Sequence, residues 1–222
     1  MLQQSFSFLL RSEFSQKITN NKILTAEIGS RLINTRDAFG VCARGAEQYA
    51  NDIFFIFRGT TGGHYGADIV TDLRMGLTIC SSGSFVHSGF NQTFSSMIPD
   101  LACFMASQRQ VRTIHCIGHS LGGAVATLAA DWASEHYNAA IKLYTFGAPR
   151  VGFGITGFAS KLTTKLSVNN IYRVYHDTDP VPMVPVFPYV HAPTKGMDYC
   201  LHYGGLVIHP PAHFMDGYVQ SV

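Results

Sequence analysis

Continuous apolar runs alternate along this chain with segments in which apolar residues recur every three or four positions. The first kind is clearest at residues 53–57, where five bulky apolar residues follow one another. A run of this length without a polar residue fits a strand buried on both faces of a parallel sheet. Similar short strands are predicted at residues 38–43, 113–117, 142–146 and 171–175. Helical spacing occurs between them, at residues 90–105, 121–135 and 155–166.

Strands alternating with helices in this order predict an α/β fold, a mostly parallel central sheet with helices on both faces. Residues 1–35 have apolar side chains at helical spacing, so we expect residues 1–50 to form a largely helical N-terminal part. After Asp179 five prolines indicate loops, followed by a predicted hairpin (199–203 and 206–208) and a short helix (212–219). No linker interrupts the pattern, so residues 1–222 are predicted to form a single domain.

Composition narrows the class of protein. Hydrophobic residues make up 46% and charged residues 14% of the 222 residues, which excludes a disordered chain. The net charge is only +2 and basic residues do not cluster, so no nucleic-acid partner is expected. The N-terminus lacks a basic region and a long apolar core, so no signal peptide is evident. We therefore expect a cytoplasmic protein or one exported by a signal-independent route.

The cysteines and histidines give no indication of a metal site. None of the five cysteines forms a C-x-x-C pair, and we expect all five to be reduced residues of the core. His209 and His213 have H-x-x-x-H spacing but lack the glutamate of a zinc protease motif. No metal or cofactor is therefore expected.

The strongest chemical signal is the pentapeptide Gly118-His119-Ser120-Leu121-Gly122, which fits G-x-S-x-G. It follows the apolar strand at 113–117 and precedes an alanine-rich helix, which is the context that a nucleophile elbow requires. The two glycines let neighbouring backbone approach a serine held on a tight turn. The helix N-terminus then directs its N–H groups toward a developing oxyanion.

This chain is similar to the class 3 lipases, a branch of the α/β-hydrolases that includes fungal triacylglycerol lipases and feruloyl esterases. Besides the elbow, five segments match the family's motifs in order between about residues 53 and 218. They are Phe57-Arg58-Gly59-Thr60, Asp68-Ile69-Val70-Thr71-Asp72-Leu73, His87-Ser88-Gly89-Phe90, the stretch from Thr145 to Gly152, and Asp179-Pro180-Val181-Pro182. The resemblance implies the α/β-hydrolase fold and a serine nucleophile at Ser120.

The acid and the histidine of a catalytic triad follow the serine in this fold. Asp177 and Asp179 both follow the strand predicted at 171–175, and the resemblance to the family's Asp-x-Val-Pro favours Asp179. Four histidines lie in the C-terminal part: His191, His202, His209 and His213. The resemblance favours His213, because Tyr218 follows it as in the family, and His209 is the alternative.

The resemblance also implies an oxyanion hole formed by the backbone N–H of Leu121 and by Thr60, which Asp72 would hold in place. Arg58, beside this loop, is expected to form a structural ion pair. The lid of the family would correspond to residues 61–67, whose glycines provide hinges. Its candidate residues are Gly62, Gly63, His64, Tyr65 and Gly66. His87 is expected either to pack in the interior or to line the mouth of the site.

These residues together predict a serine hydrolase that cleaves carboxylic esters of lipids, triacylglycerol or phospholipid, through an acyl-enzyme. The expected partners are a lipid or ester substrate and a membrane surface. The apolar stretch at 183–190 is expected to wall an acyl-chain groove, to touch a membrane or to pack in the core beneath a long loop. A compact lipase without a signal peptide also fits an antibacterial phospholipase toxin with an inhibitor or immunity protein. Two alternatives stay open: an esterase of short-chain or aromatic esters, and a catalytically silent lipase-like binding protein.

Overall fold

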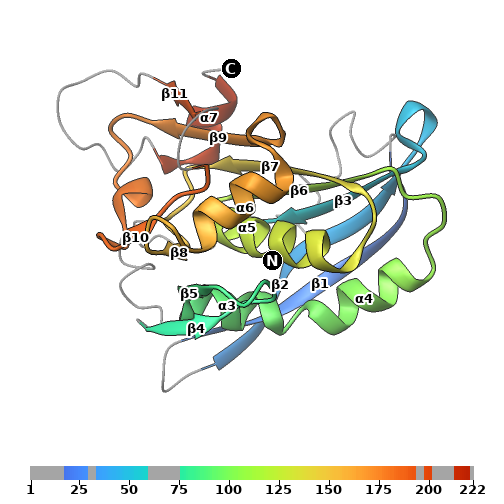
Figure 1. Ribbon diagram of the computed structural model, residues 1–222. Helices are drawn as coiled ribbons and strands as arrows, with labels where there is room; N and C mark the ends of the chain where they lie inside the picture. Colours follow the sequence, from blue (N-terminus) through green and yellow to red (C-terminus); the bar gives the residue numbers. More distant parts are fainter. Residues whose placement is uncertain (1–17, 30–33, 60–75, 194–197, 202–212, 221–222) are drawn as a thin grey trace.

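The computed structural model describes residues 18–29, 34–59, 76–193, 198–201 and 213–220 (Figure 1). Its main sheet has seven strands in the order β1-β2-β3-β6-β7-β9-β11. The five strands from β3 to β11 run parallel, whereas β1 and β2 are antiparallel to each other and β2 is antiparallel to β3. The bounds are β1 Ile18–Gly29, β2 Asn34–Gly45, β3 Asp52–Phe57, β6 Thr113–His119, β7 Ala140–Phe146, β9 Ile171–His176 and β11 Asp198–Leu201.

Most of the described helices cover one face of this sheet. The long apolar helix α5 (Leu121–His136) packs on β3, β6 and β7, and α3, α4 and α6 lie beside it on the same face. The other face receives α7, whose Tyr218 stacks on His176 at a ring distance of 4.0 Å. The remaining helices are α3 (Ser88–Ser95), α4 (Ile98–Ala106), α6 (Phe158–Leu166) and α7 (Met215–Gln220), and short 3-10 turns lie at Glu47–Tyr49, Val168–Asn170 and Val181–Met183. The predicted α/β-hydrolase architecture is confirmed.

A second, smaller sheet lies beside the carboxyl ends of the parallel strands (Figure 1). It contains four antiparallel strands in the order β10-β8-β5-β4. Its strands are short: β4 Leu77–Ile79, β5 Phe85–His87, β8 Gly152–Phe153 and β10 Tyr189–Val190. The buried carboxylate of Asp131 on α5 anchors the turn between β4 and β5 by accepting a hydrogen bond from the backbone N–H of Ser82 at 3.1 Å.

The prediction of a helical N-terminal part is wrong for residues 18–29, which form the antiparallel strand β1, whereas the strand predicted at 38–43 is confirmed within β2. Leu24 and Ala26 are fully buried while Ile23 is 53% exposed, which is the two-residue period of a strand with one buried face. Pairing along the whole length of β2 prevailed over the loose helical spacing of the isoleucines, because tertiary pairing overrides weak local preference. Residues 1–17 lie outside the described residues.

Other predicted elements need smaller corrections. The helix expected at 90–105 is two helices, α3 and α4, and Pro99 stands in the first turn of the second, where proline is well tolerated. Ile155 lies outside α6 and is 62% exposed. The first strand of the predicted C-terminal hairpin exists as β11, which pairs in parallel with β9, and residues 202–212 lie outside the described residues.

The five cysteines are all described and all free. Cys42, Cys80 and Cys116 are buried, as expected, but Cys103 and Cys200 are exposed, which corrects the prediction that all five belong to the core. Cys103 lies in an apolar run yet faces outward from α4, because a helix presents only one side to the core. Among the described helices, none combines the length and the apolar character needed to cross a bilayer.

Candidate active site

Ser120 occupies the tight turn between β6 and α5. Its φ of 53° lies in the left-handed region, which is rare for a non-glycine residue and marks a strained turn. The flanking glycines make the turn feasible. A Cβ on Gly118 would lie 2.1 Å from the carbonyl oxygen of Gly122, and one on Gly122 would lie 2.4 Å from that of Phe57. The structure therefore has the geometry that the G-x-S-x-G motif predicts.

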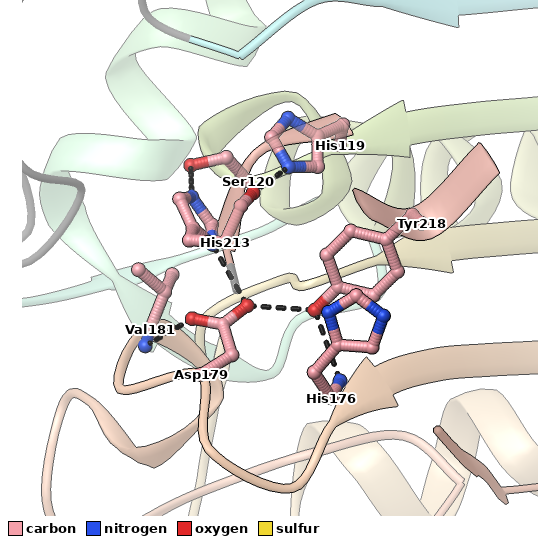
Figure 2. Close-up of polar contacts among 7 residues, drawn as sticks. All are labelled: His119, Ser120, His176, Asp179, Val181, His213 and Tyr218. Carbon is pink, nitrogen blue, oxygen red and sulfur yellow. Dashed lines mark hydrogen bonds and ion pairs between the residues drawn. The ribbon is translucent and has the colours of Figure 1, made fainter. Parts of the chain in front are cut away.

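Three of the predicted residues form a hydrogen-bonded chain (Figure 2). The Oγ of Ser120 lies 2.7 Å from Nε2 of His213, and Nδ1 of His213 lies 2.8 Å from Oδ2 of Asp179. All three residues are buried, with exposed fractions of 7% or less. These hydrogen bonds join Ser120, directly after β6, Asp179, in the loop after β9, and His213, just before α7.

Asp179 is held by two further donors. The backbone N–H of Val181 donates to its Oδ1 at 2.9 Å, and the hydroxyl of Tyr218 donates to its Oδ2 at 2.7 Å. The Tyr218 oxygen in turn accepts a hydrogen bond from the backbone N–H of His176 at 3.1 Å. Burial and the adjacent Asp179 carboxylate raise the pKa of Tyr218 above its usual value, so the hydroxyl keeps its proton and remains a donor.

His119, the residue before the serine in the motif, contacts the segment that bears His213. Its Nε2 lies 2.7 Å from the carbonyl oxygen of His213, and the two rings stack at 4.8 Å. A carbonyl oxygen only accepts, so Nε2 must be the protonated nitrogen and the donor. Burial and the neighbouring His213 lower the pKa of His119 to about 4, so the ring is neutral at physiological pH.

Gly147 leaves room for the hydrogen-bonded side chains of Asp179, Tyr218 and His213. Its φ is +54°, and a Cβ at this position would lie 2.8 Å from Oδ2 of Asp179, 2.9 Å from the hydroxyl of Tyr218 and 3.1 Å from Nδ1 of His213. The backbone N–H of Gly147 donates to the carbonyl of Val174 at 2.9 Å, which fixes the turn after β7. Only a residue without a side chain fits here.

Two of the alternatives considered for the acid and the base, Asp177 and His191, have other contacts. Asp177 is exposed, and its backbone N–H donates to the carbonyl of Leu201 on β11. His191 lies 2.8 Å, through Nε2, from the carbonyl oxygen of Pro182, and burial lowers its pKa to about 3. His202 and His209 lie outside the described residues.

The other residues expected near the site are described in part. Leu121 is the first residue of α5, directly after Ser120, as the oxyanion prediction requires. Arg58 forms an ion pair with Asp37 and donates to the carbonyl oxygen of Ala38 at 2.6 Å, which confirms the structural ion pair. Thr60, Asp72 and the lid candidates at 61–67 lie outside the described residues.

His87 packs in the interior. It is fully buried, and its Nδ1 accepts a hydrogen bond from the backbone N–H of Phe90 at 3.4 Å, which caps α3. Its ring contacts those of Phe90 and Tyr189, and burial lowers its pKa to about 4. The interior alternative of the two expectations therefore applies, and the residue is neutral.

Sequence reasoning did not assign His119 or Gly147 to the site. The spacing of Tyr218 from His213 was visible, but its hydrogen bond to Asp179 was not. No local pattern indicates these contacts, because they join residues up to 94 positions apart. Within the described ranges, no three histidine, cysteine or acidic side chains are placed to hold a metal ion.

Comparison with known proteins adds to this geometry. The family model described as lipase (class 3) matches residues 54–189, more than half of the chain. The chain belongs to the class 3 lipases. Among solved structures, this class 3 lipase is similar to lipase II from Rhizopus niveus, with a TM-score of 0.59, 27% identity and coverage of 80% of this chain and 68% of that one. The Rhizomucor miehei triacylglyceride lipase gives a TM-score of 0.62 and 26% identity, covering 83% and 66%.

Of two curated relatives of this class 3 lipase, one is named a lipase and the other a toxin. The secreted mono- and diacylglycerol lipase 1 of Fusarium solani is 36% identical over 129 residues, which are 55% of this chain and 37% of the relative. Toxin TseL of Vibrio cholerae is 34% identical over 108 residues, which are 46% of this chain and 15% of the relative. The chain thus spans well under two thirds of the length of either relative.

Proposed function

We propose that this protein is a serine hydrolase that cleaves carboxylic esters of lipids, with Ser120 as the nucleophile, His213 as the general base and Asp179 as the orienting acid. The observation that carries the proposal is the hydrogen-bonded chain from Ser120 Oγ through His213 to Asp179, which begins on a strained turn at a helix N-terminus. Nucleophile, base and orienting group within hydrogen-bond reach are the signature of an activated serine.

The mechanism follows from the positions of the protons. His213 Nε2 accepts the proton of Ser120 as Oγ attacks the ester carbonyl, and Asp179 stabilises the imidazolium that forms. The N–H of Leu121 and a donor at Thr60 stabilise the oxyanion, and removal of one such donor typically costs about 2.7–4 kcal/mol. His213 then protonates the departing alcohol, which leaves an acyl-enzyme on Ser120. Water activated by His213 releases the fatty acid.

The proposed substrate class rests on the names of the relatives. The named relatives include lipases of mono- and diacylglycerol and of triacylglycerol, which makes acylglycerols the first substrates to assay. Phospholipids present the same acyl ester to the same chemistry. Esters that are short or aromatic form the alternative class, and a protein silent on all of them but able to bind lipid is the second alternative.

The test is a hydrolysis panel with a matched inactive variant. Wild type and Ser120→Ala are incubated with short-chain esters, mono-, di- and triacylglycerol and phosphatidylcholine, and released acid is titrated. We expect fatty acid from at least one lipid with wild type and none with Ser120→Ala, whose circular dichroism stays native. Hydrolysis of short or aromatic esters alone contradicts the lipid assignment. If Ser120→Ala hydrolyses any ester as fast as wild type does, the assignment of Ser120 as the nucleophile is contradicted.

A second candidate role is suggested by the similarity to Toxin TseL: an antibacterial phospholipase that a cognate immunity protein inhibits. We infer that such a toxin harms a bacterial cell when directed to the compartment where its phospholipids are accessible. Expression of wild type there should halt growth and release fatty acid and lysophospholipid, and Ser120→Ala should be harmless. Normal growth with active enzyme present contradicts the toxin role and leaves the hydrolase assignment intact.

A further inference from the structure

The face of the main sheet opposite α5 contains a pocket. Side chains alternate between the two faces of a strand, and Phe55 of β3 points toward α5, where its ring lies 6.4 Å from that of Trp132. Its neighbour Phe54 therefore faces the other way. A pocket of about 520 Å³, lined mostly by side chains of β3, β6 and β7, lies on that opposite face. Its volume is within the usual range of small-molecule sites.

Aromatic rings stack across the strands on this face. Phe54 stacks on His115 of β6 at a ring distance of 4.7 Å, with 9° between the ring planes. His115 stacks in turn on Tyr144 of β7 at 5.9 Å and 17°, and Tyr144 on Tyr172 of β9 at 4.8 Å and 5°. Because these rings face one another, the row suits a flexible chain that lies along the ring edges better than a flat ligand stacked on a ring.

The pocket contains a lysine without a counter-ion among the described residues. Lys142 of β7 is half-buried and in register with His115, and none of the ion pairs in the described ranges includes it. Asp52, which is buried nearby, already has two partners: its carboxylate oxygens lie 3.2 Å from Nη2 of Arg112 and 3.5 Å from Nε2 of His115. Burial lowers the pKa of His115, so its ring is neutral at physiological pH. The charges of Arg112 and Asp52 cancel, which leaves the single positive charge of Lys142.

The lysine and the apolar part of the pocket lie along one strand. Lys142, Tyr144 and Phe146 are alternate residues of β7, so their side chains share a face and extend over roughly 13 Å. Ile117 of β6 is in register with Tyr144 and adds apolar surface beside it. The pocket is thus positively charged at one end and apolar or aromatic along the rest of its length.

The apolar end of the pocket is in contact with a residue of the candidate active site. The ring of Phe146 meets that of Tyr218 edge-on at 6.3 Å, and Tyr218 donates to Asp179 at 2.7 Å. Lys142, in contrast, is the third residue of β7 and lies near the amino end of the strand, whereas Ser120 follows the carboxyl end of β6. A ligand whose charged group binds Lys142 is therefore bound away from the nucleophile.

We propose that this pocket binds one fatty acid, with its carboxylate on Nζ of Lys142 and its chain along Ile117 and Phe146. One uncompensated cation matches one carboxylate, whereas a phosphate monoester would bring nearly two negative charges close to Asp52. An uncharged lipid would leave Lys142 without a partner in the pocket. The inference goes beyond the proposed function, because binding in this pocket requires no hydrolysis of an ester.

Photolabelling locates the site directly. Wild-type protein is irradiated with a diazirine-bearing fatty acid below its micellar concentration and digested, and the modified residues are identified by mass spectrometry. We expect adducts within β3, β6 or β7, at residues 52–57, 113–119 or 140–146, that excess unlabelled fatty acid prevents. Adducts confined to residues 76–99 and 180–193, in and around the second sheet, overturn the proposal, as does the absence of any adduct.

Calorimetric titration with decanoate and decanol separates the two parts of the ligand. Lys142→Met should weaken decanoate binding roughly tenfold, which is the typical effect of one charge-assisted hydrogen bond, and leave decanol binding unchanged. Ile117→Asn should weaken both ligands severalfold, because it removes apolar contact with the chain. Lys161→Met, at an exposed lysine of α6, and Ile23→Asn, at a 53% exposed isoleucine of β1, are the matched controls and should bind as wild type does.

Circular dichroism and urea unfolding show whether each variant keeps the fold. If Ile117→Asn unfolds, Lys142→Met decides alone, since methionine replaces the apolar stem of a half-buried lysine. Equal affinity of Lys142→Met and wild type for decanoate overturns the proposal, as does equal affinity of wild type for decanoate and decanol. If no ester is hydrolysed but the labelling and the affinities are as expected, the proposed function fails and the fatty-acid site stands.

Discussion

Replacement of Gly147 by alanine tests whether the packing around the candidate triad has the geometry described. The new Cβ would lie within 3.1 Å of three polar atoms that hydrogen-bond one another, on Asp179, Tyr218 and His213. A glycine with positive φ elsewhere, Gly154, provides the matched control. Its φ is +76°, and a Cβ there meets no heavy atom within 4 Å.

Both substitutions place an alanine at a positive φ, but only the new Cβ of Gly147→Ala collides with neighbouring side chains. An L-residue in the left-handed region costs about 1–2 kcal/mol, which both variants should lose in unfolding free energy. Gly147→Ala must in addition weaken a hydrogen bond to the buried Asp179 carboxylate, and such bonds are worth about 1.5–3 kcal/mol. Displacement of a catalytic group by about 1 Å can reduce turnover by about 100-fold.

The assay combines urea unfolding with turnover of a soluble chromogenic ester. We expect Gly154→Ala to keep wild-type kcat, and Gly147→Ala to lose about 100-fold in kcat and to be the less stable of the two. Equal kcat and equal unfolding free energies for the two variants would refute the close packing of Asp179, Tyr218 and His213 around Gly147.

Three further substitutions test single contacts. Tyr218→Phe removes a donor to Asp179 and should lower both kcat and the unfolding free energy, the latter by about 1.5–3 kcal/mol in urea titrations. Arg58→Leu leaves Asp37 without its ion-pair partner and should lower the unfolding free energy by on the order of 1–3 kcal/mol by the same measurement. The lowered pKa of His87, about 4, means that the unfolded chain binds a proton which the folded chain does not. Unfolding free energy should therefore fall as pH drops from about 6.5 toward 4. His87→Asn, which keeps a capping acceptor, should remove the part of that decline due to His87 and leave the part due to His119 and His191, whose pKa values are also lowered.

Controls separate these effects from general damage. Tyr49→Phe removes a hydroxyl from a 36% exposed tyrosine of the turn Glu47–Tyr49, and Arg109→Leu removes a charge from an exposed position; both should leave kcat and stability near wild type. A Tyr218→Phe variant indistinguishable from Tyr49→Phe speaks against the hydrogen bond to Asp179. A pH dependence that is the same with and without His87 shows that another group causes it.

Local chemistry explains what the sequence predicted well. The run at 53–57 is β3 because five consecutive bulky apolar residues suit only an environment buried on both sides. The turn at Ser120 was predictable because glycines at fixed offsets are a steric requirement of the backbone, visible at Gly118 and Gly122. The elbow, the parallel strands and the terminal helix all follow from such short-range rules.

Long-range pairing explains what the sequence did not predict. β1 forms because residues 18–29 have β2 to pair with, and isolated apolar spacing carries no information about that partner. The hydrogen bond from His119 to the carbonyl of His213 joins positions 94 residues apart, and the space that Gly147 leaves depends on three other segments. Contacts of this kind arise only when the fold brings the loops together.

Active-site labelling with a fluorophosphonate tests the central claim most directly, because this probe reacts only with a serine that its surroundings activate. After labelling, the protein is digested and the modified peptide is identified by mass spectrometry. The account predicts one adduct, on Ser120, that is absent from Ser120→Ala and greatly reduced in His213→Ala. No adduct on folded wild-type protein, or an adduct on a different serine, would contradict the claim that Ser120, His213 and Asp179 form a working catalytic triad.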